Sequence, residues 1–507
     1  MLPSLCDTDR VTDTRQPEPR PGAGPLALSC IDIAEAAGGS LIRASSRAIR
    51  GAAVDSRKVE RGNLFVALPG ENTDGHRFLG AAVDLGASCL LVRDDAEVGV
   101  VTAAAETADC GIVAVPDTLI GLQRVAAVWR LRFDPLVVGV TGSIAKTSTK
   151  EAIAAVLSRR FRTLKSEGNA NNEIGLPLTV LRMAPEHEAA VLEMGMYVGG
   201  EIATLARIGR PRIGVVTAVL GVHLSRIGSI DAVEQAKGEL VEALPADGVA
   251  VLNGDDERVR RMARRTAARA MTYGFGPRVD VAAADVVSLG ADGMRFTLRT
   301  PAGAADVATP ALGRHGVHNG LAAAATGIAA GLRLDQIVAG LEVGWHADHR
   351  DRLVRKGGVA ILDDTYNASP ASMLAALELL ASLPGRHVAV LGEMRELGEA
   401  HEEGHLRVGE TAGKVLDRLI VVGPEASGIV RGAVVLGDRA TLVPDREAAL
   451  AVLREELRSG DAVLVKASRG VALEWVVEAV EAMVSSWSGP AVGDGAAAAR
   501  KAGEEIE

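Results

Sequence analysis

Apolar runs and helical stretches alternate along most of the chain. Four short apolar runs each end at glycine or polar residues and precede a segment with the apolar spacing of an amphipathic helix; they lie at residues 136–140, 189–195, 213–219 and 249–256. This order predicts a largely parallel β-sheet with helices on both of its faces. A strand-rich insert at about residues 271–300 and a helix over residues 318–332 complete the region.

The segments on either side have the same character. Residues 27–132 combine short helices and strands into a compact α/β unit. After about Gly344 the alternation restarts, and four strands that end at polar residues predict a Rossmann-like unit. We therefore expect an α/β protein with three domains and two tails, divided as 1–25 (tail), 26–134, 135–344, 345–486 and 487–507 (tail).

Length and composition agree with this division. At about 150 residues per domain, 507 residues correspond to roughly three domains. The 48% hydrophobic and 24% charged residues are typical of a globular protein. No apolar run reaches the roughly 18 residues that a membrane helix needs, and the first residues lack the pattern of a secretory signal. We expect a cytoplasmic protein without membrane insertion.

Charge and cysteine content argue against two further classes of site. The formal net charge of −10 disfavours a nucleic-acid partner, which a broad basic surface would have to hold. Cys6, Cys30, Cys89 and Cys110 show no metal-ligand spacing and are expected to be reduced thiols. Only nine of the 55 basic residues are lysines, so each lysine either performs chemistry that arginine cannot or has escaped a compositional bias.

A turn between an apolar strand and a helix is the first candidate site. Its residues are Gly142, Ser143, Ile144, Ala145, Lys146, Thr147 and Ser148. The N–H groups of such a turn can hold a polyphosphate, with the lysine on phosphate oxygens and the threonine hydroxyl on Mg²⁺. Taken alone, the turn could also be a chance strand-turn-helix.

Ala145 departs from the usual pattern of such loops, which have glycine at this position. If the position needs a positive φ, the alanine Cβ costs roughly 1–2 kcal/mol. If it does not, the replacement is mild.

Three later polar residues follow the loop in the order of a metal and nucleotide site. Glu193 ends an apolar strand, His223 follows another strand, and Lys237 lies on a predicted helix. An acidic residue at the carboxyl edge of a parallel sheet is well placed for Mg²⁺. Each residue also has an ordinary interpretation: Glu193 as a helix-capping carboxylate, His223 as a satisfied loop histidine, and Lys237 as a solvated side chain.

A series of motifs in a fixed order resembles the Mur ligase family over about residues 27–485. The central motifs are TGSIAKTSTKE, GNANNEIGLPLTVL, LEMGMYVGGEIATLARIGRP and HLSRIGSIDAVEQAKGEL; the C-terminal ones are ILDDTYNASPASM, VAVLGEMRELGEAHEEGH and VLVKASRG. In the N-terminal unit, Asp55, Ser56 and Arg57 precede NLFVALPGENTDGHRF. The chain is most similar to the members that join D-alanyl-D-alanine to a UDP-N-acetylmuramoyl-tripeptide.

The resemblance implies a function as well as a fold. It implies an N-terminal domain that binds a UDP-sugar, a central ATPase and a C-terminal Rossmann-like domain that closes over the nucleotide. The implied reaction is ATP-dependent amide-bond formation in peptidoglycan precursor synthesis. ATP activates a carboxylate of the UDP-linked peptide as an acyl phosphate, and the amine of D-alanyl-D-alanine attacks to give the amide, ADP and phosphate. Family members are usually monomers.

The resemblance also implies roles for the reactive side chains. Lys146, Glu193, His223 and Lys237 would be catalytic. Of two Mg²⁺ ions, Thr147 and Glu193 would hold one and His223 would help to hold the other. Lys237 would react with CO₂ to form a carbamate, which supplies an anionic metal ligand.

Further residues match the nucleotide and substrate positions of the family. Asn319 would contact adenine, Arg352 the phosphates on closure, and Asp364 the ribose side. The residues assigned to the UDP-peptide and amine substrates are Asp55, Ser56, Arg57, Asn171, Asn172, Asn367 and Lys466.

The departures from the family pattern lie beside the reactive side chains, which are themselves kept. Ala145 and Ala467 replace glycines, Gly316 stands where the family has an asparagine, and residues 218–222 lack the usual Asn and Pro-Ala. Two alternatives therefore stay open. One is a paralogue that joins another carboxylate to another amine in a specialised pathway. The other is a nucleotide-binding protein that has lost turnover through Ala145.

Overall fold

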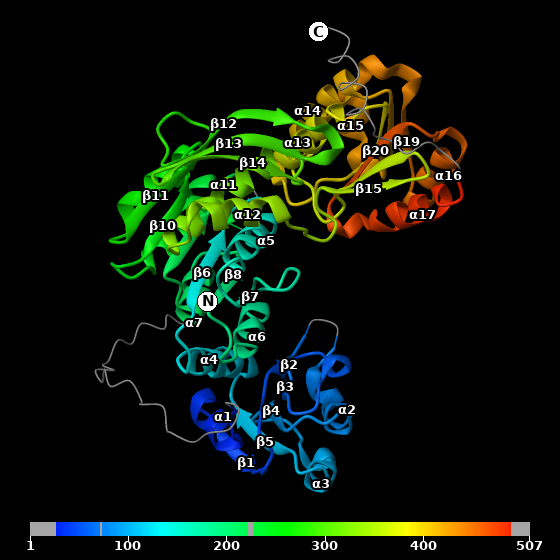
Figure 1. Cartoon of the computed structure of the whole chain (residues 1–507). Coiled ribbons are helices and arrows are strands. Elements are labelled where there is room, and N and C mark those ends of the chain that lie inside the picture. The colour runs from blue at the N-terminus through cyan, green and yellow to red at the C-terminus, as the bar shows by residue number, and fades with distance from the viewer. Residues whose placement is uncertain (1–26, 71–72, 222–226, 488–507) are drawn as a thin grey trace.

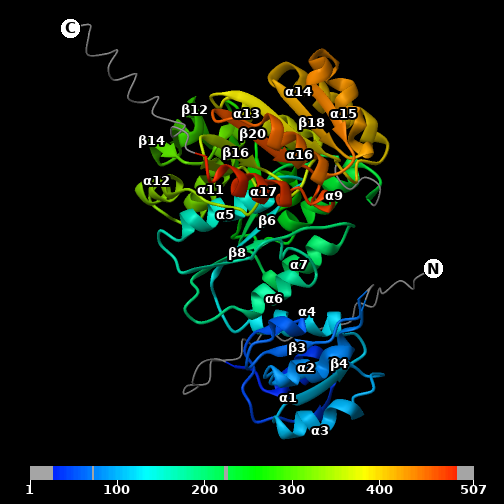
Figure 2. The ribbon, with the colours of Figure 1, turned by 90° about the vertical axis from the view of Figure 1, so that its right-hand side faces the viewer.

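The computed structural model describes residues 27–70, 73–221 and 227–487. Within them, β-strands form three sheets that follow one another along the chain, and helices cover each sheet (Figure 1). The predicted α/β fold with a parallel central sheet and a C-terminal Rossmann-like unit is confirmed. Both views place the N-terminal lobe at one end of the molecule and the C-terminal lobe at the other (Figures 1 and 2).

The N-terminal sheet has five strands in the order β1-β5-β4-β3-β2. Its four strands β2 to β5 are parallel, and β1 is antiparallel to β5. The strands are β1 (Ser40–Arg43), β2 (Ala52–Ala53), β3 (Leu64–Val66), β4 (Cys89–Arg93) and β5 (Gly111–Val115). The helices are α1 (Cys30–Ala37), α2 (Leu79–Asp84), α3 (Gly99–Thr107) and α4 (Thr118–Arg130).

Helix α4 fastens the N-terminal lobe to the central one. Asp117 begins the helix by accepting hydrogen bonds from the backbone N–H groups of Leu119 and Ile120. At its other end, Trp129 donates to the carbonyl of Met183 over 3.1 Å, and Arg130 donates to the carbonyl of Gly209 over 2.9 Å. One hydrophobic core therefore runs from the N-terminal lobe into the central one.

The central sheet has nine strands in the order β14-β13-β12-β11-β10-β9-β6-β8-β7. The first seven along the chain are β6 (Leu136–Thr141), β7 (Thr163–Lys165), β8 (Ala189–Glu193), β9 (Ile213–Val216), β10 (Val249–Asn253), β11 (Arg269–Gly274) and β12 (Val281–Ser288), and they are parallel. Strands β13 (Met294–Thr300) and β14 (Gly303–Thr309) are antiparallel. The carboxyl ends of the parallel strands thus meet at one edge.

Helices pack on both faces of the central sheet, as the alternation predicts. They are α5 (Lys146–Leu157), α6 (Gly175–Leu181), α7 (Glu201–Gly209), α9 (Ile230–Glu242), α10 (Glu257–Arg261), α11 (Gly313–Ala329) and α12 (Leu334–Val343). Small residues let these helices approach closely. A Cβ on Gly340 of α12 would lie 2.6 Å from the Cα of Val156 in α5.

The C-terminal sheet has six strands in the order β15-β16-β20-β17-β18-β19. They are β15 (Arg352–Lys356), β16 (Val359–Asp363), β17 (Arg386–Gly392), β18 (Arg418–Val422), β19 (Ala440–Val443) and β20 (Asp461–Lys466), and all but β15 are parallel. The helices are α13 (Pro370–Ala381), α14 (His401–Val415), α15 (Ser427–Gly432), α16 (Arg446–Glu456) and α17 (Glu474–Val484). Because β20 lies between β16 and β17, a crevice for ligands is expected at the carboxyl ends of these strands.

Several expectations from composition can be compared with the described residues. None of the helices in these ranges is long and apolar enough to cross a membrane. Cys30, Cys89 and Cys110 are free and buried, as expected of reduced thiols, whereas Cys6 lies outside the described residues. Residues 1–26 and 488–507 also lie outside them, so the two tails and the proposed domain limits stay predictions.

Candidate active site

The candidate phosphate loop lies where the sequence predicts it, between β6 and α5. Lys146 is the first residue of the helix, and its ammonium donates to the carbonyl of Gly142 over 2.8 Å. Burial lowers the pKa of Lys146; the carboxylate of Glu193 opposes this change and the charge of Arg350 adds to it. Thr147 is buried beside it. The loop lysine therefore lies within electrostatic reach of both Glu193 and Arg350.

Backbone geometry explains two positions of the loop. Gly142 cannot carry a side chain, since a Cβ there would lie 1.8 Å from the Thr217 hydroxyl, which donates to the carbonyl of Ile144 over 2.6 Å. Ala145 has a φ of 62°, so this position does need a positive φ and the alanine side chain is strained there. Its Cβ costs about 1 kcal/mol or more relative to glycine.

Glu193 ends β8 at the carboxyl edge of the sheet and is almost completely buried. Its Oε1 accepts a hydrogen bond of 2.8 Å from the amide of Asn171, so the structure brings these two predicted residues together. Its Oε2 is buried and has no hydrogen-bond partner among the described residues. A buried carboxylate oxygen without a partner is costly, and a bound cation would satisfy it.

These oxygen groups fit Mg²⁺, which prefers carboxylate and hydroxyl oxygens. The free Oε2 of Glu193 and the hydroxyl of Thr147 are the protein groups that would hold it. In the part of the chain that the structure describes, no group of three or more His, Cys, Asp or Glu residues is arranged for a metal. A magnesium site here would therefore need further oxygen ligands besides these two groups, such as those of a bound nucleotide.

Lys237 lies in the middle of α9 and is buried. Burial lowers its pKa well below the ordinary value, and the charge of Lys146 lowers it further. The interpretation of Lys237 as a solvated side chain is therefore excluded. His223 lies outside the described residues, so its predicted role stays a prediction.

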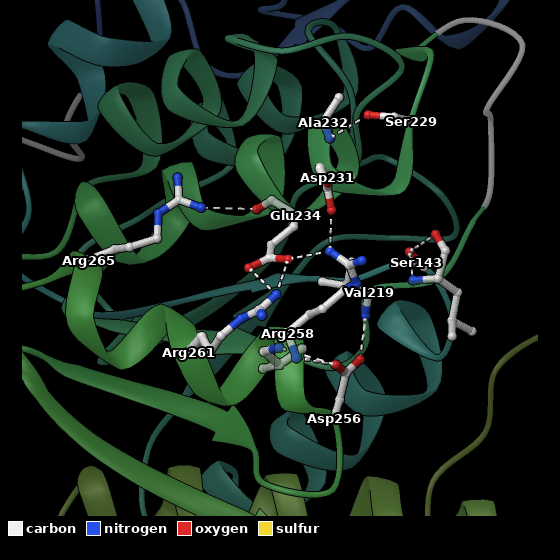
Figure 3. A network of polar contacts seen from close by, with 12 residues as sticks. Ser143, Val219, Ser229, Asp231, Ala232, Glu234, Asp256, Arg258, Arg261 and Arg265 are labelled. Carbon is white, nitrogen blue, oxygen red and sulfur yellow. Dashed lines mark hydrogen bonds and ion pairs between the residues drawn. The ribbon is translucent and has the colours of Figure 1, made fainter.

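A network of polar contacts holds α9 and the segment after β9 in place (Figure 3). The Ser143 hydroxyl donates to the carbonyl of Leu220 and accepts from its N–H, over 3.0 and 2.9 Å. Arg258 reaches from α10 to Asp231 and Glu234 of α9, over 2.5 and 2.7 Å. The segment that leads to His223 is thus tied to the phosphate loop, and α9 to α10.

Asn319, the predicted adenine contact, lies on α11 and is buried. Its side-chain oxygen accepts a hydrogen bond of 3.1 Å from Thr149 in α5, so it is close to the phosphate-loop helix. The neighbouring His318 lies 3.2 Å from the side-chain oxygen of Asn253 and 3.6 Å from a carboxylate oxygen of Asp255. The polar contacts of these two α11 residues therefore reach α5 on one side and the end of β10 on the other.

The C-terminal lobe contributes a cluster of paired charges. The ammonium of Lys466 lies 2.5 Å from the Asp364 carboxylate and donates to the Asn367 carbonyl over 2.8 Å. Burial raises the pKa of Asp364 to about 6, against the effect of Lys466. Across the lobe boundary, His315 of α11 lies 3.2 Å from Asp351. Lys466 is thus engaged within the chain, and its predicted contact with substrate stays a prediction.

Two arginines near the start of β15 are placed differently. Arg352 is paired with Glu481 over 2.9 Å and with Asp363 over 3.4 Å. Arg350 stacks on Tyr366, with 4.0 Å from its guanidinium carbon to the ring centre, and its charge acts on Lys146 and Asp364. The contact with the phosphates predicted for Arg352 stays a prediction, but the sequence reasoning overlooked Arg350, although it lies only two residues away.

The remaining substrate residues lie apart from this centre or have local roles. Asp55, Ser56 and Arg57 belong to the N-terminal lobe, where Arg57 binds Asp55 through bonds of 2.9 and 2.7 Å. Asn172 accepts from the N–H of Gly175, the first residue of α6, over 2.8 Å. Of the residues assigned to the UDP-peptide, only Asn171 touches the candidate metal carboxylate.

Three family patterns match the chain in succession. They are described as the Mur ligase family catalytic domain, the Mur ligase middle domain and the Mur ligase glutamate ligase domain, and they match residues 48–129, 140–327 and 349–469. Together they cover more than half of the chain. It belongs to the Mur ligase family.

Curated relatives of this Mur ligase match it along most of their length. UDP-N-acetylmuramoyl-tripeptide–D-alanyl-D-alanine ligase of Escherichia coli is 37% identical over 435 residues, which are 84% of this chain and 92% of the relative. The Mycobacterium tuberculosis H37Rv protein of the same name is 37% identical over 500 residues, 90% of this chain and 98% of the relative.

Solved structures agree with the fold of this Mur ligase. A crystal structure of MurF from Acinetobacter baumannii has a TM-score of 0.81 at 29% identity and covers 90% of this chain and 99% of its own. MurF ligase from Thermotoga maritima in complex with ADP has a TM-score of 0.75 at 30% identity, covering 86% and 98%. The three-domain architecture is therefore that of MurF.

Proposed function

We propose that this Mur ligase is an ATP-dependent ligase that joins D-alanyl-D-alanine to a UDP-N-acetylmuramoyl-tripeptide in peptidoglycan precursor synthesis. The observation that carries the proposal is the buried Oε2 of Glu193, which has no hydrogen-bond partner in the described part of the chain and lies within electrostatic reach of the phosphate-loop lysine. This arrangement occurs in a chain 37% identical to an Escherichia coli enzyme named for that reaction. Activation of a substrate carboxylate by ATP needs the nucleotide, a metal cation and that carboxylate at one place, and Glu193 would hold the cation.

The residues of this chain supply most of the required charge arrangement. In the proposal, loop N–H groups and Lys146 hold the triphosphate of ATP, Asn319 lies at its adenine end, and Arg350 approaches the phosphates from the C-terminal lobe. Glu193 and Thr147 would hold Mg²⁺. When bound, Mg²⁺ supplies stabilisation of the negative charge that develops during phosphoryl transfer.

The environment of Lys237 supports a carbamate. Only a neutral amine attacks CO₂, and burial keeps the pKa of Lys237 well below its ordinary value. The new N–C bond forms with loss of a proton and leaves an anion on a residue that would otherwise be a buried base. That anion would add an oxygen ligand to the proposed Mg²⁺ site, and His223 would add a ring nitrogen.

The proposal is tested by mass detection of the amide product together with ADP release. UDP-N-acetylmuramoyl-tripeptide, D-alanyl-D-alanine, ATP, Mg²⁺ and bicarbonate should yield one amide for each ADP. A panel of other carboxylates and amines belongs in the same experiment. If other substrates yield an amide but UDP-N-acetylmuramoyl-tripeptide and D-alanyl-D-alanine do not, the proposal is wrong. The protein would then be a paralogue from a specialised pathway, the alternative that the departures at Ala145, Gly316 and Ala467 keep open.

A second experiment addresses the carbamate. Lys237→Ala should lose about 100-fold or more in rate, because an anionic metal ligand disappears, and added small carboxylates should restore part of it. Glu234→Ala on the same helix is the control and should not respond to carboxylates. Unchanged activity in Lys237→Ala would refute this role.

Localisation and assembly are part of the proposal. We expect the enzyme to act in the cytoplasm, where UDP-linked precursors and ATP are available, and to act as a monomer. Light scattering on the purified protein tests the second expectation; a dimer mass would contradict it.

A further inference from the structure

Lys150 is completely buried in α5, one helical turn after the phosphate-loop lysine. Its ammonium donates to the carbonyl of Ser166 over 2.7 Å and to the carbonyl of Gly168 over 3.3 Å, and it lies 3.0 Å from Oε1 of Glu151. An ammonium has three donors, and here three oxygens surround it. The planar guanidinium of arginine cannot point its donors in these three directions from one atom.

The two carbonyl groups belong to the loop of residues 166–171, which joins β7 to the region before α6. This loop is in contact with Glu193 at two points. The Ser166 hydroxyl accepts a hydrogen bond of 3.1 Å from the N–H of Glu193. Asn171, at the other end of the loop, donates to Oε1 of Glu193 over 2.8 Å.

The far end of the loop is fixed by close packing. The Asn171 carbonyl accepts from the N–H of Gly195 over 2.7 Å, and a Cβ on Gly195 would lie 3.0 Å from the side-chain oxygen of Asn171. The loop thus lies between a buried cation on one side and β8 with its following turn on the other. Any shift of its backbone would move the groups that orient the Glu193 carboxylate.

We propose that Lys150 is a positioning residue: by holding loop 166–171, it aims the free oxygen of Glu193 at the metal and nucleotide site. This inference rests on the proposed function, since it assigns Glu193 to a metal. Lys150 also connects the nucleotide site to the UDP-peptide site. It lies on α5, which follows the phosphate loop, and it holds loop 166–171, which leads to Asn172, a residue predicted at the UDP-peptide site. The buried ammonium of Lys150 thus joins α5 to loop 166–171.

The test variant is Lys150→Met, whose unbranched side chain is one atom shorter and has none of the three donors. Lys165→Met is the matched control, because Lys165 pairs with the other oxygen of Glu151, is 44% exposed and has no bond to the carbonyls of Ser166 or Gly168. ADP binding is measured by calorimetry with and without Mg²⁺. This readout does not require turnover.

In Lys150→Met we expect the gain in ADP affinity on addition of Mg²⁺ to fall about 10-fold or more, as for other residues that orient a metal ligand. Binding of ADP without Mg²⁺ should stay within about 2-fold of the wild type, and Lys165→Met should show the full gain. If Mg²⁺ raises the ADP affinity of Lys150→Met as much as that of the wild type, the inference is overturned. Equal weakening with and without Mg²⁺ also overturns it, because that result indicates a general loss of structure.

Ser166→Ala decides the matter if Lys150→Met does not fold. It removes the bond to the N–H of Glu193 and leaves the buried ammonium with its three oxygens. A reduced Mg²⁺ gain supports the part of the inference in which loop 166–171 orients Glu193, and a full gain overturns the inference, because Lys150 is proposed to act through that loop. If the wild type shows the Mg²⁺ gain but forms no amide product, the proposed function fails while the role of Lys150 is still decided by the binding measurement.

Discussion

Two groups of buried charges in this Mur ligase differ in how completely they are paired. In the phosphate-loop group, Oε2 of Glu193 has no partner among the described residues, and burial depresses the pKa values of Lys146 and Lys237. In the C-terminal group, Lys466 forms a buried ion pair with Asp364, and the partly exposed His315 lies 3.2 Å from the Asp351 carboxylate across the lobe boundary, at ion-pair distance without hydrogen-bond geometry.

We infer from this difference that the charges of the first group bind a ligand, whereas those of the second group stabilise the fold. A buried charge without a partner destabilises the protein, so a group of such charges is maintained only where something else completes it. A buried pair resists separation, because removing one partner leaves the other uncompensated. Substitutions in the first group should therefore affect activity more than stability, and substitutions in the second should do the reverse.

The largest effect is expected from Lys146→Ala. Loss of the loop cation should lower the rate of ADP release about 1,000-fold, since a fixed charge at a developing phosphate is worth that much. The free energy of unfolding should change little, because the half-buried ammonium of Lys146 bonds only to backbone carbonyls of its own loop and has no carboxylate partner within ion-pair distance among the described residues. ADP release and urea unfolding measure the two quantities, with the exposed Lys356→Ala as control. Strong destabilisation would contradict the comparison.

Lys466→Met should have the opposite profile. Because Asp364 is left buried beside an apolar side chain, we expect a loss of about 3 kcal/mol in the free energy of unfolding. The double variant Lys466→Met with Asp364→Asn should recover part of the loss, since neither charge then remains. Urea unfolding gives both values. If Lys466→Met lowers the free energy of unfolding by well under 1 kcal/mol, the pair does not stabilise the fold and the comparison fails for it.

The His315–Asp351 pair predicts a pH dependence. Burial tends to lower the pKa of His315, but Asp351 outweighs it and the pKa is raised above 6.5. The stabilisation from charged His315 is thus complete below pH 6.5 and is lost as the pH rises through the raised pKa. His315→Gln should be less stable than the wild type at pH 6, by at most about 1 kcal/mol, and the difference should shrink toward pH 9. Unfolding at both pH values checks this; a constant difference is the contrary result.

The smallest effect concerns the backbone beneath Lys146. Ala145→Gly relieves the positive φ of 62° and should raise the free energy of unfolding by up to about 1 kcal/mol. Ala467→Gly is the control, because Ala467 lies outside the positive-φ residues, is fully buried and packs against Gly392. It should not be stabilising. Thermal unfolding compares the two, and equal shifts would mean that strain at Ala145 is negligible.

The sequence predicted the fold because parallel strands buried on both faces appear as continuous apolar runs. For the same reason it predicted the positions of Glu193 and of the phosphate loop, which follow such runs directly. It did not identify Arg350, because that residue lies in a turn rather than in the strand. His349 and Asp351 have φ values of 57° and 48°, and no periodic pattern predicts which side chain such a turn directs to the site.

Taken by itself, the sequence determined the family, the alternation of strands and helices and the order of the reactive residues, since these depend on local pattern and motif spacing. Only the tertiary structure decided which charges are paired. Glu193 and Asn171 are 22 residues apart, and Lys466 and Asp364 are 102 apart, so each contact depends on how the strands are ordered in their sheet. The lysines show the same division. The sequence shows only that Lys150 is one of nine lysines among 55 basic residues, whereas the three oxygens around its ammonium show why arginine would not serve there.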